Sequence, residues 1–204
     1  MSTTQQQTHE TTRKTALLQA AKELFGEYGY AETTFKKISE RAGVALGLLT
    51  HHYGNKEKLF LACGMDVLEN FLARLRESTK AAATGHDAVM NFCREYLAYS
   101  IDPTTNWRVL VRCSPYSDMK TSSDKEVMFR KFLEIHAVLH EALDRGVADG
   151  TIVDVDTQAT TLTIVSMMVG VNRTRVLTPY ASENLYEEAL KFVARAISPS
   201  ENKK

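Results

Sequence analysis

Residues 33–56 hold the side chains of this chain that are best suited to bind an anion or to read a polar edge. They supply hydroxyl, imidazole and ammonium donors, and such donors bind phosphate oxygens and the edges of bases. The candidate contact residues are Thr33, Thr34, Lys36, Lys37, Ala45, Leu46, Gly47, Thr50, His51, His52, Tyr53 and Lys56. The chemistry that they predict is recognition of double-stranded DNA.

Two short helices are expected to position these side chains. Thr33 and Thr34 are N-cap candidates for a first helix that ends at Gly43, and a second helix is expected over residues 45–53. The link Ala42-Gly43-Val44 needs a backbone angle that favours glycine. Helices joined in this way form a helix-turn-helix, in which the second helix enters the major groove and the first crosses the phosphate backbone.

Several residues of this motif have more than one possible role. Leu46 either packs inside or lies at the first turn of the second helix and touches thymine methyl groups. The pairs His51–His52 and Lys36–Lys37 are either solvated or in contact with DNA. Lys56, at the start of the next helix, is expected at a phosphate. The apolar residues expected in the core are Phe35, Ile38, Val44 and Leu49.

This stretch resembles the TetR (tetracycline repressor) family of transcription regulators. The resemblance is carried by the run Thr34–Val44, by Leu49, by His51–Tyr53 and by Asn55–Leu59, and it covers about residues 13–63. It implies an all-helical protein with a DNA-binding head and a C-terminal regulatory domain. It also implies that the chain is not an enzyme but a regulator of transcription.

Three positions depart from the pattern of the family. Ala45 stands where the family usually has serine or threonine as the cap of the recognition helix, and Thr50 stands where it usually has tyrosine. Leu46 occupies a position that is often polar or basic. An alanine cap costs about 1 kcal/mol of helix stability. A hydroxyl residue at position 50 gives a weak likeness to the choline/betaine-responsive branch of the family.

The resemblance implies a homodimeric repressor that releases a palindromic DNA operator when a small-molecule inducer binds. The alternative is a helix-turn-helix DNA-binding protein with no small-molecule inducer, which is controlled by a protein partner or acts architecturally. An enclosed, partly apolar cavity in the C-terminal domain favours the first, and a filled core favours the second.

Candidate ligand-binding residues lie in the second half of the chain. Arg108 and Arg112, four residues apart, are either exposed or paired, or they line a pocket for an acid or a polar head group. His136 and His140 share a helix face, but no third ligand lies nearby, so a pocket or core role is expected and no metal site. The full set is Trp107, Arg108, Arg112, Tyr116, His136, His140, Met167 and Asn172.

Other classes of protein are not supported by the sequence. It contains no G-x-G-x-x-G, Walker, H-E-x-x-H or G-x-S-x-G motif, so neither an enzyme nor a cofactor is expected. The three cysteines form no C-x-x-C pair and are expected to be buried and reduced. The net charge is zero, so DNA binding must depend on a local surface. A polar N-terminus and short apolar runs predict a cytoplasmic protein with no membrane partner.

Apolar residues recur with the helical period along most of the chain, which predicts an all-α fold of about nine helices. Residues 1–10 are expected to be a flexible arm, 11–58 a DNA-binding domain, and 59–204 a regulatory and dimerisation domain. The last two predicted helices, about 157–177 and 182–197, carry apolar residues over much of their circumference. We therefore expect them to form the dimer interface.

Overall fold

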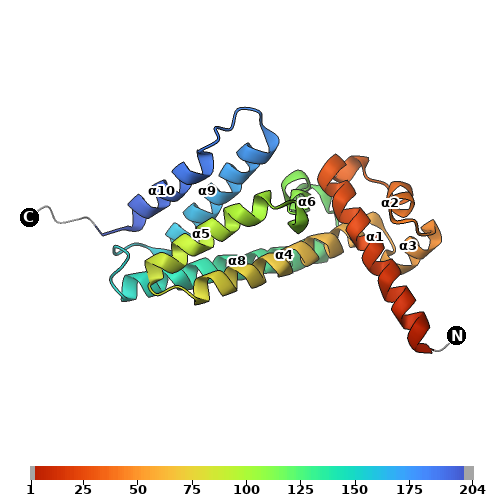
Figure 1. Cartoon of the computed structure of the whole chain (residues 1–204), viewed down its shortest axis with the longest axis horizontal. Coiled ribbons are helices and arrows are strands. Elements are labelled where there is room, and N and C mark those ends of the chain that lie inside the picture. Colours follow the sequence, from red (N-terminus) through yellow and green to blue (C-terminus); the bar gives the residue numbers. More distant parts are fainter. Residues whose placement is uncertain (1–2, 200–204) are drawn as a thin grey trace, which may run out of the picture. The chain divides into compact units, whose positions relative to one another are not determined.

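The computed structural model describes residues 3–199, except for the side chains of residues 3–11 and 115–116. Every regular element in this range is a helix, which confirms the all-α prediction (Figure 1). The elements are α1 (Thr3–Glu32), α2 (Phe35–Ala42), α3 (Leu46–Tyr53), α4 (Lys56–Lys80), α5 (Gly85–Ile101), the 3-10 turn η1 (Pro103–Thr105), α6 (Arg108–Arg112), α7 (Pro115–Asp118), α8 (Ser122–Ala148), α9 (Thr157–Leu177) and α10 (Leu185–Ile197).

The chain divides into two compact units. Unit 1 consists of the residues up to Leu68 together with Pro103–Arg130, and unit 2 consists of Glu69–Asp102 and the residues from Lys131 onward. Helices α4 and α8 therefore contribute residues to both units. The functional division that the sequence suggested, after residue 58, stays a prediction.

The core of unit 1 forms where α1 packs against α2, α3 and α6. Helix α1 turns an apolar stripe inward, as its helical spacing of apolar residues predicts; the stripe consists of Leu17, Ala20, Ala21, Leu24 and Phe25. Aromatic rings from α1 and α4 meet beside it: the Phe25 and Phe60 rings lie 5.5 Å apart edge to face, and Tyr30 lies 5.3 Å from Phe60. Fully buried residues of this core are Leu17, Ala21, Phe25, Ile38, Leu49, Leu59 and Phe60.

In unit 2, α9 and α10 run antiparallel beside α5 (Figure 1). A polar cluster joins the three helices inside this layer. The hydroxyl of Tyr186 donates to Oδ1 of Asn172 at 3.4 Å and lies 3.2 Å from Oγ of Ser100. The buried side chains of these three helices include Val89, Phe92, Leu97, Ile164, Met168 and Val193.

Helix starts differ from the sequence prediction at three places. Helix α1 begins at Thr3, so residues 3–10, which were expected in an arm, form its first turns, while residues 1–2 lie outside the described range. The run Ser123-Asp124-Lys125-Glu126 predicts a capping box that opens a helix, but α8 begins one residue earlier, at Ser122. Helix α10 has Asn184 at its N-cap instead of Ser182. The mobility expected of the first ten residues stays a prediction.

The sequence predicts one helix over residues 104–114, but the structure has two separate elements there, η1 and α6. Asn106 has a φ of 56°, a left-handed conformation that asparagine tolerates, and this residue separates η1 from α6. Over residues 3–199, none of the helices is both long and apolar enough to cross a membrane.

Candidate nucleic-acid interface

Helix α2 is fixed at both ends by its own chain. Oγ1 of Thr34 accepts a hydrogen bond from the backbone N–H of Lys37 at 3.2 Å, as expected of an N-cap. Gly43 follows the helix with a φ of 64°, and its N–H donates to the carbonyl of Glu40. The left-handed angle explains why glycine stands at the turn.

Thr33 lies inside the protein. Its side chain is fully buried, and its hydroxyl is 2.7 Å from the carbonyl oxygen of Gly29 and 3.1 Å from that of Leu24. These carbonyls belong to the last turns of α1, on either side of the break that Gly29 makes in that helix. We therefore assign the Thr33 side chain to positioning α2 rather than to contact with a phosphate.

Helix α3 exposes the side chains of Leu46, Thr50 and His51 and buries that of Leu49. Leu49 is fully buried, whereas Leu46 is 47% exposed. Ala45 precedes the helix in an extended conformation with no side-chain cap. Gly47 lies in open space, because a Cβ atom built there would meet nothing within 4 Å.

Among the polar residues of α3, Thr50 and His51 are exposed. Oγ1 of Thr50 donates to the carbonyl of Leu46 at 3.3 Å. His52 is only partly exposed, and its Nε2 atom is buried with no hydrogen-bond partner among the described residues. Of the two histidines, His51 is therefore the one whose ring is available to an external partner.

Tyr53 ties the end of α3 to α1. Its hydroxyl donates to the carbonyl of Lys14 at 3.3 Å, and burial raises the pKa of this phenol to about 12. Lys14 and the neighbouring Arg13 are exposed. Neither residue was among the contact residues predicted from the sequence. The signal that could have identified them is a basic pair at the start of the α1 stripe.

Lys56 is held by the carboxyl end of α1. Its Nζ atom donates to the carbonyl oxygens of Tyr30 at 3.0 Å and Ala31 at 3.4 Å, and it lies 4.3 Å from the centre of the Tyr30 ring. Cations are stabilised at this end of a helix dipole. The ammonium group thus has partners within the chain, and a phosphate contact by Lys56 stays a prediction.

The charged residues of α2 differ in how closely they are held. Nζ of Lys37 donates to the carbonyl of Glu32 at 2.8 Å. The Arg41 guanidinium pairs with Glu23 at 3.2 Å, whereas Lys36 lies 3.9 Å from Glu40 with its side chain 79% exposed. Lys36 is therefore the α2 cation that is most open to a phosphate.

The first turn of α4 binds the start of α8. One carboxylate oxygen of Glu57 accepts from the backbone N–H groups of Thr121 at 2.7 Å and Lys120 at 3.0 Å, and the Thr121 bond is the main cause that lowers the pKa of Glu57. Beside it, Nζ of Lys58 lies 2.6 Å from Oδ1 of the buried Asp124. The residues directly after the recognition helix thus fix the N-terminus of α8.

The ligand candidates within unit 1 do not form one site. Trp107 is buried, whereas Arg108 and Arg112 are exposed. The side chain of Tyr116 lies outside the described residues. Contact of these residues with a ligand stays a prediction.

The candidates within unit 2 take part in separate contacts. His140 lies 3.3 Å from both Asp144 and the Thr157 hydroxyl, and burial lowers the pKa of His136. Asn172 belongs to the polar cluster with Tyr186, and Met167 lies in a groove between α9 and α10. None of these contacts identifies a ligand.

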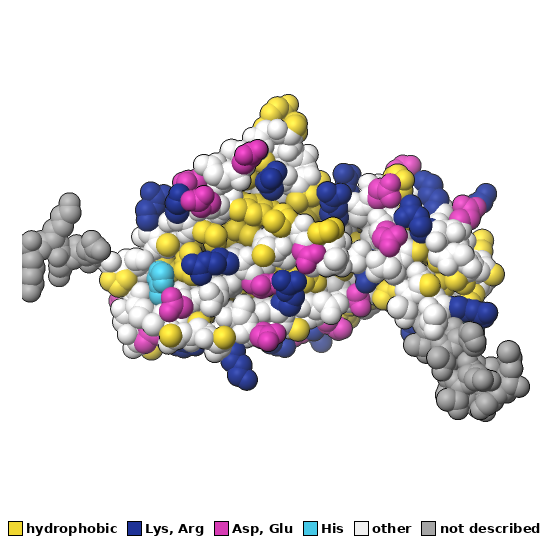
Figure 2. Space-filling model, viewed as in Figure 1, with side chains coloured by type: hydrophobic (Ala, Val, Ile, Leu, Met, Phe, Trp, Pro, Cys, Tyr) yellow, Lys and Arg dark blue, Asp and Glu magenta, His cyan; other side chains and the backbone are white. Residues whose placement is uncertain are grey.

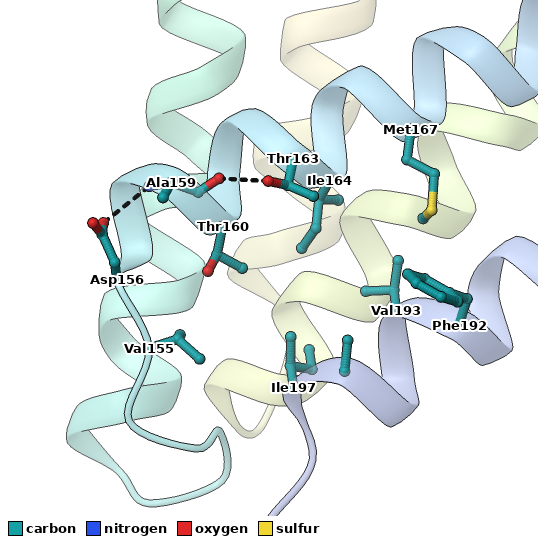
Figure 3. A pocket seen from close by; sticks show the side chains of 11 residues that line it. Val155, Asp156, Ala159, Thr160, Thr163, Ile164, Met167, Phe192, Val193 and Ile197 are labelled. Atoms are coloured by element: carbon teal, nitrogen blue, oxygen red, sulfur yellow. Dashed lines mark hydrogen bonds between the residues drawn. The ribbon is translucent and has the colours of Figure 1, made fainter.

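The groove between α9 and α10 has a volume of about 340 Å³ and is mainly apolar. Figure 3 shows Ile164 and Met167 of α9 opposite Phe192 and Val193 of α10. Phe192 of α10 is 55% exposed, and Leu162 of α9 is 51% exposed. Figure 2 shows hydrophobic side chains gathered on the surface of this part of unit 2.

Comparison with known proteins agrees with the geometry of α1 to α4. Residues 17–63 match the family described as bacterial regulatory proteins, tetR family. The HTH-type transcriptional repressor AcnR of Corynebacterium glutamicum is 28% identical over 134 residues, which are 65% of this chain and 63% of that protein. The HTH-type transcriptional regulator BetI of Rhizobium meliloti is 30% identical over 132 residues, 63% of this chain and 60% of that protein.

The chain thus spans less than two thirds of the length of these curated relatives. Among solved structures, the transcriptional regulator FadR of Bacillus subtilis in complex with stearoyl-CoA superposes with a TM-score of 0.74 at 20% identity. That match covers 90% of this chain and 99% of the other, so the fold is shared along almost the whole length.

Proposed function

Because this chain belongs to the tetR family of bacterial regulatory proteins, we propose that it is a homodimeric transcriptional repressor. In this proposal α3 reads a palindromic operator in double-stranded DNA, and a small-molecule inducer releases the protein from it. The proposed contact residues are those predicted from the sequence, apart from the buried Thr33 side chain, with Arg13 and Lys14 added.

The observation that carries the proposal is the state of α3. The helix is positioned by the buried Leu49, and its remaining surface offers Leu46, Thr50 and His51 to solvent. The preceding helix α2 leaves Lys36 accessible beside it. A short exposed helix next to a basic residue is the arrangement with which a helix-turn-helix reads base edges and contacts phosphates.

The exposed apolar residues of α9 and α10 support dimerisation. Leu162 and Phe192 are each about half exposed, and the groove between the two helices is lined by apolar side chains. Apolar surface of this kind is stabilised when a second copy covers it. A two-fold axis through such an interface would place two recognition helices on successive turns of DNA, about 34–36 Å apart or a multiple of that spacing.

An inducer acts only by binding the DNA-incompetent form more tightly than the DNA-bound form. The solved complex of FadR with stearoyl-CoA supports a small-molecule ligand for a protein of this fold.

DNA binding is tested by sequencing the fragments of the source genome that the protein retains. We expect a palindromic sequence to be enriched, and the double variant Thr50→Ala, His51→Ala to lose its retention in a gel-shift assay. Thr79→Ala is the matched control, because the Thr79 hydroxyl donates to a carbonyl four residues earlier, as that of Thr50 does. Unchanged operator affinity in the double variant would contradict the role of α3.

Dimerisation is tested by light scattering, which should give twice the chain mass of 22.9 kDa. Leu162→Glu and Phe192→Glu should shift the mass to that of one chain, because burying an unpaired charge is unfavourable. Val127→Glu, which is also at an exposed apolar position, serves as the control. A dimer that survives both α10 and α9 substitutions would place the interface elsewhere.

A further inference from the structure

We propose that each half of the operator carries a thymine at the first turn of α3, and that Leu46 recognises the 5-methyl group of this base. The inference rests on the DNA-binding function proposed above. It adds the kind of base that the helix selects and the residue that selects it.

Leu46 is the first residue of α3. Its side chain is 47% exposed, more than that of any other large apolar residue of this helix. The first turn of a recognition helix is the part that comes closest to the base edges. In the major groove, the methyl group of thymine is the one apolar feature that a base pair displays. An exposed leucine at this position therefore matches thymine better than it matches any hydrogen-bonding edge.

The rest of α3 offers few of the side chains that read other bases. Its sequence, Leu-Gly-Leu-Leu-Thr-His-His-Tyr, contains no arginine, lysine, asparagine or glutamine, the residues that form bidentate contacts with guanine or adenine. The hydroxyl proton of Thr50 is already donated to the carbonyl of Leu46. Hydrogen-bonded recognition by α3 is thus left mainly to His51, and apolar contact has a larger share than is usual for such a helix.

Gly47 brings the backbone beside Leu46 close to the groove. Beyond Gly47, its two chain neighbours and the adjacent backbone of α3, no atom of the described residues lies within 4 Å of the position that a Cβ atom would take there, so packing does not explain the glycine. Glycine lowers the stability of a helix interior, but it permits close approach of a backbone to a partner. A close approach at this turn is what contact between Leu46 and a base methyl group needs.

The experiment compares thymine with uracil, which pairs identically but lacks the methyl group. A pool of random DNA duplexes is first selected on the full-length protein, and each thymine of the enriched sequence is then replaced by uracil in turn. Burial of one methyl group predicts that uracil at one position of a half-site weakens binding by roughly fourfold. Replacement in both half-sites should weaken it by more than tenfold.

Leu46→Ala should remove this uracil penalty, while Ile101→Ala, at an exposed apolar position outside α3, should keep it. Wild-type binding that is insensitive to uracil at every position would overturn the inference, and so would a penalty that persists in Leu46→Ala. A penalty abolished only by Thr50→Ala would assign the methyl contact to Thr50 instead. Failure to enrich any sequence contradicts the DNA-binding function itself, and with it the inference.

Discussion

Helices α2 and α3 have eight residues each and are joined by a single turn, yet they are stabilised in opposite ways. Helix α2 has a threonine cap at its start and a left-handed glycine at its end. Its Lys37 and Arg41 bind groups of α1. Helix α3 lacks a side-chain cap and has no lysine, arginine, aspartate or glutamate.

The difference shows that α2 is stabilised by contacts with the rest of its own chain, whereas α3 leaves its polar surface available to a partner. The hydrogen bonds and ion pairs of α2 are satisfied within unit 1, so this helix has a structural role in addition to any contact with DNA. Helix α3 is held by the burial of Leu49 and by the hydrogen bond of Tyr53 to α1, and its exposed face carries no charged lysine, arginine or carboxylate that binds the rest of unit 1. An element of low local stability is typical of a binding surface.

The largest expected effect is at Leu49, the fully buried residue of α3. Leu49→Ala should lower the free energy of unfolding by about 2–5 kcal/mol, because it removes a fully buried side chain and leaves a cavity. Urea unfolding followed by circular dichroism measures this change. Leu46→Ala, three residues earlier and half exposed, should change stability by no more than about 0.5 kcal/mol. Equal losses in the two variants would show that α3 is not held by Leu49.

Thr33→Val tests the turn that leads into α2. The substitution keeps the shape of the side chain and removes the donor, so the carbonyls of Leu24 and Gly29 lose a partner and stability should fall by about 1–3 kcal/mol. Thr163→Val is the control, because that hydroxyl also bonds a helix carbonyl but is exposed. If both variants unfold at the wild-type midpoint, the buried hydroxyl contributes nothing.

Substituting alanine for the two glycines around the turn should change the stability of the protein in opposite directions. Gly43→Ala places a side chain at a φ of 64° and should destabilise the protein by about 1–2 kcal/mol. Gly47→Ala should stabilise it by about 0.5–1 kcal/mol, since Gly47 lies in open space within a helix. Differential scanning calorimetry separates the two. A destabilising Gly47→Ala would mean that the glycine serves the fold and not a partner.

Substitutions at the two helix caps should have smaller effects on stability, similar in size and opposite in sign. Thr34→Ala should lower stability by about 1 kcal/mol, and Ala45→Ser should raise it by a similar amount by giving α3 the cap that it lacks. Hydrogen exchange of the α2 and α3 amides would locate each change. Slower exchange in α2 rather than α3 on substitution of Ala45 would contradict the assignment of the cap.

The smallest expected effect is at Glu57, on the helix that follows α3. The Thr121 and Lys120 N–H groups lower the pKa of this carboxylate in the folded protein. Its stabilising contribution is therefore present above the ordinary glutamate value of about 4.3 and is lost as pH falls through the lower folded value. Glu57→Gln should flatten the acid side of the stability profile measured by urea unfolding, and Glu69→Gln, at an exposed position of the same helix, serves as the control.

Local signals in the sequence identified α2 and α3 well. The hydroxyl at residue 34, the glycine at residue 43 and the apolar spacing between them act within one or two helical turns, so the sequence alone contains the information. Local signals do not identify the branch of the family or the residues that bind a ligand. Whether Trp107 or Asn172 lines a pocket depends on packing between segments that are far apart in the chain.

Thr33 and Lys56 show why the rest of the site was harder to predict. Adjacent threonines look alike as caps, and only the positions of the Leu24 and Gly29 carbonyls determine that Thr33 is the buried one. The phosphate contact of Lys56 stays a prediction, but its hydrogen bonds to the carbonyls of Tyr30 and Ala31, 26 and 25 residues earlier, could not be foreseen from the sequence. In each case the partner is a backbone group, which leaves no pattern in the sequence.

The absence of lysine and arginine from α3 has a consequence for ionic strength. Counterions are released from DNA only when cationic side chains neutralise phosphates, and this release makes binding sensitive to salt. In this protein the proposed lysine and arginine contacts belong to α1, α2 and the start of α4, while α3 contains neither residue type. Added salt should therefore weaken binding to the operator and to unrelated duplexes in parallel, and the ratio between the two affinities should stay almost constant.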